Sequence, residues 1–149
     1  MEPIQDNMQK YNNYAEQMRR LKKAIASGFY LEAIFIEYAL LEDRLESILR
    51  HSGKWKPDPN RYTSITAKCS KVAKMAEQKK TLANRYFPKE MTDSVLAWVD
   101  KRNKLIHALL KQSLHTEDLQ AVSQQGESLV KLFCSKSTSF NRALEKSKG

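Results

Sequence analysis

Apolar residues recur at steps of three and four along five segments of this chain, and this spacing constrains the fold more than any other feature. It places apolar side chains on one face of an α-helix, whereas a half-buried β-strand alternates every second residue. Sustained alternation of the second kind is missing, so we expect essentially no sheet. The predicted helices cover about residues 4–25, 30–51, 64–83 and 88–111, and a fifth begins at residue 116.

Turn-forming residues separate several of these segments. Gly28 supplies a stop after the first helix, and Pro57 and Pro59 break the chain after the second. Trp55, in that connection, is interpreted as a loop anchor. A chain of 149 residues is long enough for one domain with one core. The sequence therefore predicts an all-α, single-domain helical bundle of about five helices over residues 1–149, with a frayed tail at 136–149.

The charge balance favours anionic partners. With 26 Lys and Arg against 17 Asp and Glu, the formal net charge is +9, which attracts polyanions such as nucleic acid or an anionic membrane. The alternative is that surplus lysine only keeps the protein in solution. We expect the lysine-rich third helix and the fourth helix to gather nucleic acid through Lys68, Lys71, Lys74, Lys101 and Lys104.

The cysteines and the apolar runs of the sequence indicate neither a cofactor site nor a membrane-spanning segment. Cys69 and Cys134 are the only cysteines, and their spacing fits no zinc or redox motif. We interpret them as small hydrophobes in a reducing compartment, and expect neither a metal nor another cofactor. No apolar run reaches the roughly 18 residues of a membrane span, and the N-terminus does not resemble a secretory signal. We therefore expect a cytoplasmic protein without membrane contact.

Arg102 occupies an unusual place on the predicted fourth helix. On a helical wheel it falls near the middle of the apolar arc rather than on the polar face. A buried arginine needs a partner, so Arg102 either pairs with a carboxylate or points into a cleft or subunit interface. Glu37 on the second helix is the favoured carboxylate partner, and Glu42 is the next. A purely structural Arg–carboxylate pair is the alternative to a functional role.

Asn103 and His107 lie four residues apart on the same helix, so they share the flank where its apolar arc meets its polar face. An imidazole moves protons near neutral pH, and a neighbouring guanidinium holds a phosphate and stabilises its developing charge. This combination suits phosphodiester cleavage without a metal. His51 and His115 lie at helix ends, where structural roles are more common.

The segment Arg102-Asn103-Lys104-Leu105-Ile106-His107 resembles the R-x-x-x-x-H motif of HEPN domains, which often place a polar residue after the arginine. The resemblance implies a small helical bundle that forms a homodimer, with two motif copies facing one another in a metal-independent ribonuclease site. Arg102 would then bind the scissile phosphate, His107 would transfer protons, and Asn103 would orient them. Leu109 stands where some toxin members carry a tyrosine.

Two functions remain open on the sequence. The first is a homodimeric HEPN-type endoribonuclease in a toxin or phage-defence role, acting on RNA and controlled by a cognate antitoxin or regulatory protein. The second is a non-catalytic helical module that binds nucleic acid or a protein. Convergence of His107 and Arg102 from two chains on one open basic cleft favours the first function, and an Arg102 sealed against Glu37 favours the second.

Overall fold

The computed structural model describes residues 1–148, which contain six α-helices and no strand. The all-helical bundle is therefore confirmed. The helices are α1 (Asn7–Ala26), α2 (Tyr30–His51), α3 (Ile65–Ala76), α4 (Leu82–Tyr86), α5 (Lys89–Ala108) and α6 (Thr116–Lys148). No helix within residues 1–148 combines the length and the apolar character needed to cross a membrane.

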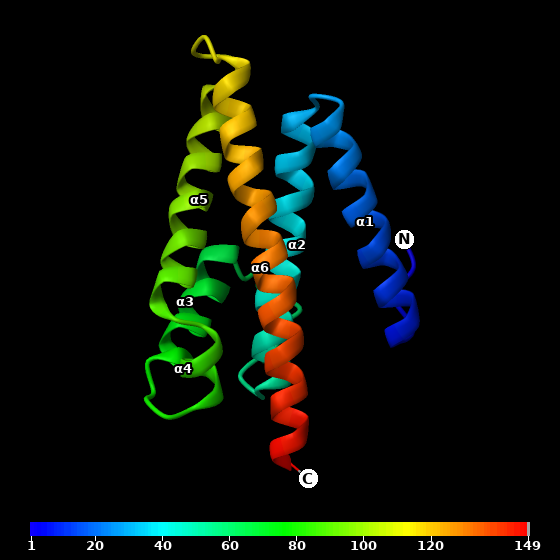
Figure 1. The fold of residues 1–149 in the computed structure, drawn as a ribbon, viewed down its shortest axis with the longest axis vertical. Helices are drawn as coiled ribbons and strands as arrows, with labels where there is room; N and C mark the ends of the chain where they lie inside the picture. Colours follow the sequence, from blue (N-terminus) through cyan, green and yellow to red (C-terminus); the bar gives the residue numbers. More distant parts are fainter. Residues whose placement is uncertain (149) are drawn as a thin grey trace.

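Helix α2 is the central element, as the sequence predicts, because it packs against α1, α3 and α6. Figure 1 shows that α2 and α6 run in the same direction, while α1 and α5 run in the opposite one. The sharp return from α1 to α2 depends on Gly28, whose φ of +77° is readily adopted only by glycine. This arrangement places the end of α5 and the beginning of α2 at the same end of the bundle.

The predicted third helix is in fact two helices, α3 and α4. Lys80 has a φ of +66°, which interrupts the helical path between them. Thr81 caps α4 by accepting a hydrogen bond from the Asn84 backbone N–H, and the Asn84 side chain donates to the Ala76 carbonyl at the end of α3 (2.8 Å). These side-chain bonds satisfy backbone groups at both helix ends, so the break is stable.

The expectation that residues 136–149 form a frayed tail is wrong for the residues that the structure describes, because α6 continues to Lys148. Ser137 and Phe140 are buried, and the Phe140 ring contacts Phe87 and Tyr86. Tertiary packing therefore stabilises the last turns of α6. The fourth predicted helix ends earlier than expected, at Ala108 rather than Lys111, and Gly149 lies outside the described residues.

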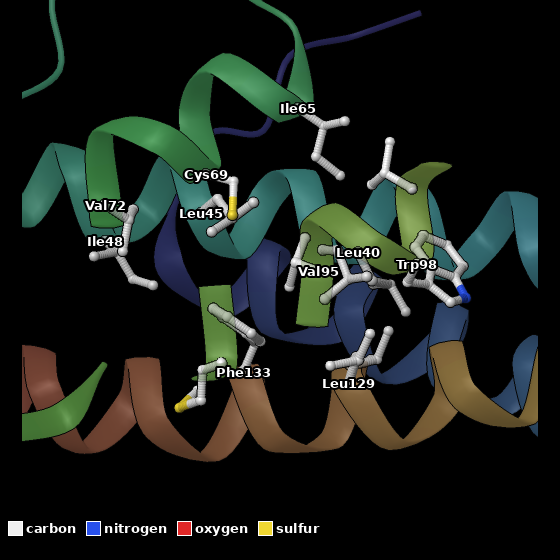
Figure 2. Packing of buried hydrophobic residues seen from close by; sticks show 14 of the residues in the cluster. Leu40, Leu45, Ile48, Ile65, Cys69, Val72, Val95, Trp98, Leu129 and Phe133 are labelled. Carbon is white, nitrogen blue, oxygen red and sulfur yellow. The ribbon is translucent and has the colours of Figure 1, made fainter. Parts of the chain in front are cut away.

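One hydrophobic core receives side chains from every helix. Figure 2 shows residues of α2, α3, α5 and α6 meeting in this core, with Trp98 at one end of the labelled group. Trp98 is fully buried, and its indole N–H donates to the Val122 carbonyl on α6 (2.9 Å). This hydrogen bond fixes the position of α5 along the axis of α6.

Gly126 lets α6 approach α2 and α5 closely, as its place on the apolar face predicts. A Cβ atom at this position would overlap the Glu37 carboxyl group and lie 2.8 Å from the Trp98 ring. Gly126→Ala is therefore expected to lower the free energy of unfolding by about 1–3 kcal/mol, because the added methyl group overlaps its neighbours. This loss outweighs the higher helix propensity of alanine relative to glycine. Urea denaturation followed by circular dichroism measures this change.

A second variant tests the origin of that loss. Because Glu37→Ala removes the overlapping carboxyl group, Gly126→Ala should cost less in that background than in the wild type. An increase in stability for the single Gly126→Ala variant would contradict the close approach of the helices.

Candidate functional site

Arg102 is half-buried on α5, and its guanidinium group rests against aromatic rings of α2. Its Cζ atom lies 4.2 Å from the centre of the Tyr38 ring and 5.5 Å from that of Phe35. An aromatic face attracts a cation electrostatically, and the attraction strengthens where water is partly excluded. We call the surface formed by Phe35 and Tyr38 the aromatic notch.

The prediction that Glu37 pairs with Arg102 is wrong. Glu37 is fully buried, and within residues 1–148 no hydrogen-bond partner reaches either of its carboxyl oxygens. Burial, with a smaller contribution from the charge of Glu127, raises the pKa of Glu37 to about 9. Glu37 therefore stays protonated and neutral at pH 7, and Arg102 obtains its stabilisation from the aromatic notch instead.

Glu42 and Lys68 also differ from their predicted roles. Lys68 lies on the buried face of α3, and its ammonium group pairs with Glu42 (3.1 Å) and Glu46 (3.3 Å) on α2. It also lies over the ring of Trp55, which packs against the core and so acts as the predicted loop anchor. Lys68 is therefore a link between α2 and α3 rather than an RNA-binding lysine, and Glu42 is its partner rather than that of Arg102.

Asn103 and His107 are both exposed on α5. The Arg102 Nη1 atom donates a hydrogen bond to the Asn103 amide oxygen (2.9 Å). His107 follows Arg102 by five positions, which places their side chains about 140° apart around the helix. One chain thus presents the guanidinium toward α2 and the imidazole in a different direction.

The remaining predicted RNA-binding lysines fall into two separate groups. Lys71 and Lys74 are exposed on α3 and line a groove of about 540 Å³, whose other residues are Lys54, Met75, Glu77 and Gln78. We call this the lysine groove. Lys101 and Lys104 instead line a groove between α5 and α6, and Lys104 pairs with Asp100 (2.8 Å).

Sequence reasoning missed the aromatic residues that hold Arg102. Phe35 and Tyr38 are three residues apart on α2, so they are neighbours on its surface. A pair of aromatic side chains at this spacing, opposite an arginine on an apolar arc, is the signal that could have identified them.

The chain matches no protein-family model, no curated protein and no solved structure.

Among residues 1–148, no group of three or more His, Cys, Asp or Glu side chains is placed to hold a metal ion. Cys69 is buried, and burial raises the pKa of its thiol to about 12, so it remains a neutral thiol.

Proposed function

We propose that this protein is a metal-independent endoribonuclease of the HEPN type, with Arg102, Asn103 and His107 as its catalytic residues. The observation that carries the proposal is the environment of Arg102. Its charge is held against the aromatic notch and Asn103, and no carboxylate within residues 1–148 forms an ion pair with it. An arginine that is positioned but not neutralised is suited to binding a phosphate.

The reaction we propose needs no reactant beyond RNA. The 2′-hydroxyl attacks the adjacent phosphorus, the bond from phosphorus to the 5′-oxygen breaks, and a 2′,3′-cyclic phosphate and a 5′-hydroxyl result. His107 transfers a proton in this exchange, and Arg102 stabilises the negative charge that develops on the phosphate. Asn103 keeps the guanidinium in position through its amide oxygen.

The separation of Arg102 and His107 around α5 supports a site completed by a second copy of the chain. Because the two side chains point about 140° apart, one copy cannot readily direct both at the same phosphate. In a two-fold homodimer, Arg102 of one copy is able to face His107 of the other. We further propose a toxin or phage-defence role in the cytoplasm, under the control of a cognate antitoxin or regulatory protein.

Cleavage of a mixed pool of single-stranded and structured RNA, with EDTA present, tests this proposal. Arg102→Ala and His107→Ala are each expected to lower the cleavage rate at least about 100-fold, because each removes a group that acts in the transition state. His115→Ala is the matched control, since His115 is exposed and lies outside the site, and its rate should equal that of the wild type.

Mixing the two inactive variants tests the shared site. A heterodimer of Arg102→Ala and His107→Ala chains contains one site with both groups intact, so part of the activity should return. Wild-type protein that binds RNA but leaves every substrate uncut would instead favour the non-catalytic nucleic-acid-binding module.

A further inference from the structure

Three lysines from two segments of the chain line the lysine groove. Lys54 follows the end of α2, and Lys71 and Lys74 lie on α3. All three are exposed, and none of them forms an ion pair within residues 1–148. Among the described residues that line the groove, only Glu77 is acidic. Positive charge therefore predominates in this groove.

Several other lysines of the chain are neutralised by nearby carboxylates. Lys68, on the buried face of α3, pairs with two glutamates of α2, and Lys104 on α5 pairs with Asp100. In the groove, by contrast, Lys71 and Lys74 are three residues apart on α3, so they are neighbours on its surface and their charges repel. A bound polyanion removes this repulsion, and the groove therefore favours an anionic ligand.

Local contacts hold two sides of the groove in place. Gly53, with a φ of +73°, turns the chain after α2, and the Lys54 backbone N–H donates to the Leu49 carbonyl (2.8 Å). The Lys71 ammonium group lies 5.5 Å from the centre of the Trp55 ring, close enough for a cation–π contact. Trp55 itself packs against the core. These contacts reduce the ordering that binding of an anion would require.

We propose that the lysine groove binds the phosphate backbone of a nucleic-acid strand, at a place separate from the proposed catalytic residues. The residues that line the groove include neither the aromatic notch nor Arg102, Asn103 or His107. The groove volume of about 540 Å³ lies within the range of about 300–1,000 Å³ that is typical of ligand sites. The inference goes beyond the proposed function and shares with it only the class of ligand.

The shape and chemistry of the groove favour a nucleic-acid strand over a membrane. The apolar face of α3, which includes Ile65, Cys69 and Val72, is buried in the core, so it cannot insert into a bilayer. A positively charged groove is the surface that typically follows the backbone of a single strand. Lysine ammonium groups bind phosphates as point charges and do not read the bases. We therefore expect the groove to bind many sequences, and RNA and DNA alike.

The salt dependence of binding tests the groove. The probe is a fluorescein-labelled single-stranded RNA of about 16 nucleotides, the upper end of the lengths that one single-strand-binding fold covers. Its dissociation constant is measured by fluorescence anisotropy with EDTA present, in His107→Ala protein so that the RNA stays intact. Lys71→Ala/Lys74→Ala removes two phosphate contacts, each of which contributes about 0.7 to the slope of log affinity against log salt concentration. The slope should become shallower by about 1.4, and the affinity in about 0.1 M salt should fall about twentyfold.

Two variants serve as controls. Lys22→Ala/Lys23→Ala removes the same charge from exposed positions near the end of α1, which lies at the opposite end of α2 from the groove (Figure 1), and should leave the affinity and the slope nearly unchanged. Glu77→Gln should strengthen binding, because it removes a charge that repels phosphate. Single-stranded DNA of the same sequence should lose affinity by the same factor in Lys71→Ala/Lys74→Ala. Thermal denaturation verifies that each variant is folded.

Two outcomes would overturn the lysine groove as a nucleic-acid site. One is an unchanged dissociation constant in Lys71→Ala/Lys74→Ala, and the other is an equal loss in Lys22→Ala/Lys23→Ala, which would indicate an effect of net charge alone. Unchanged RNA binding together with lost binding to vesicles that contain phosphatidylserine would assign the groove to a lipid surface instead. If the wild type cleaves RNA in any of these cases, the nuclease proposal stands and only the groove proposal fails. If RNA binding depends on the groove but no RNA is cleaved, the groove proposal stands and the nuclease proposal fails.

Discussion

The free energy of unfolding is expected to fall as the pH rises from 4.5 to about 9, and Glu37→Gln is expected to flatten this dependence. The ordinary pKa of a glutamate is 4.5, whereas burial raises that of Glu37 to about 9 in the folded protein. Between these values the unfolded chain has lost the proton and the folded chain retains it. Unfolding therefore releases a proton, and a rising pH favours the unfolded state.

The expected change of the free energy of unfolding with pH is steep for a single residue. One proton released on unfolding corresponds to about 1.4 kcal/mol per pH unit, so the loss amounts to several kcal/mol across this range. Below pH 4.5 both states hold the proton, and the effect is absent. Urea denaturation at a series of pH values measures it.

The control for this prediction is Glu77→Gln, because Glu77 is exposed at the end of α3. That variant should keep the pH dependence of the wild type. A wild-type stability that does not change between pH 5 and pH 9, or an equal slope in Glu37→Gln, would show that Glu37 is not buried in its neutral form.

Phe140→Ala is expected to lower the free energy of unfolding by about 3–5 kcal/mol, since it removes a buried aromatic side chain and leaves a cavity. Phe140 is 1% exposed, and the centre of its ring lies 5.0 Å from that of Phe87 in an edge-to-face arrangement. Chemical denaturation followed by circular dichroism measures the change.

Leu132→Ala provides the comparison within the same helix, because Leu132 is 38% exposed. Its cost should be clearly smaller than that of Phe140→Ala, since less apolar area leaves water at that position. Similar costs for the two variants would show that the end of α6 does not pack against α4.

Local signals account for the parts of the fold that the sequence predicts well. The bounds of α2 and the start of α6 agree with the prediction. Gly28 marks the turn before α2, and Thr116 begins the acidic first turn of α6. Such signals act within a few residues, so one sequence is enough to reveal them.

The errors arise where distant contacts decide the structure. The break between α3 and α4 depends on the Asn84 side chain reaching back to Ala76, with no proline or glycine to mark it. The last turns of α6 are rich in lysine and serine, and the order of this segment comes from Phe140 packing on Phe87. Tertiary packing overrides local composition in both places.

In the candidate site, too, a local signal predicts one feature and distant contacts decide another. The wheel predicts correctly that Arg102 faces inward, because that inference needs only helical periodicity. The wheel does not identify the partner of Arg102, since both a carboxylate and an aromatic face stabilise a half-buried guanidinium. Only the arrangement of α2 against α5 shows that Tyr38 and Phe35 take this role while Glu37 turns toward Gly126.

Under the proposed function, the length of α2 determines how long an RNA strand must be to reach two separate surfaces of one chain. From Phe35 at the aromatic notch to His51 at its C-terminal end, the helix rises about 24 Å at 1.5 Å per residue, and Lys54 of the lysine groove follows three residues later. A strand that occupies both surfaces has to extend along most of the bundle, whereas a very short oligonucleotide fits only one of them. Affinity should thus increase in a step once the strand becomes long enough to bridge the two surfaces, as it does for two linked binding sites.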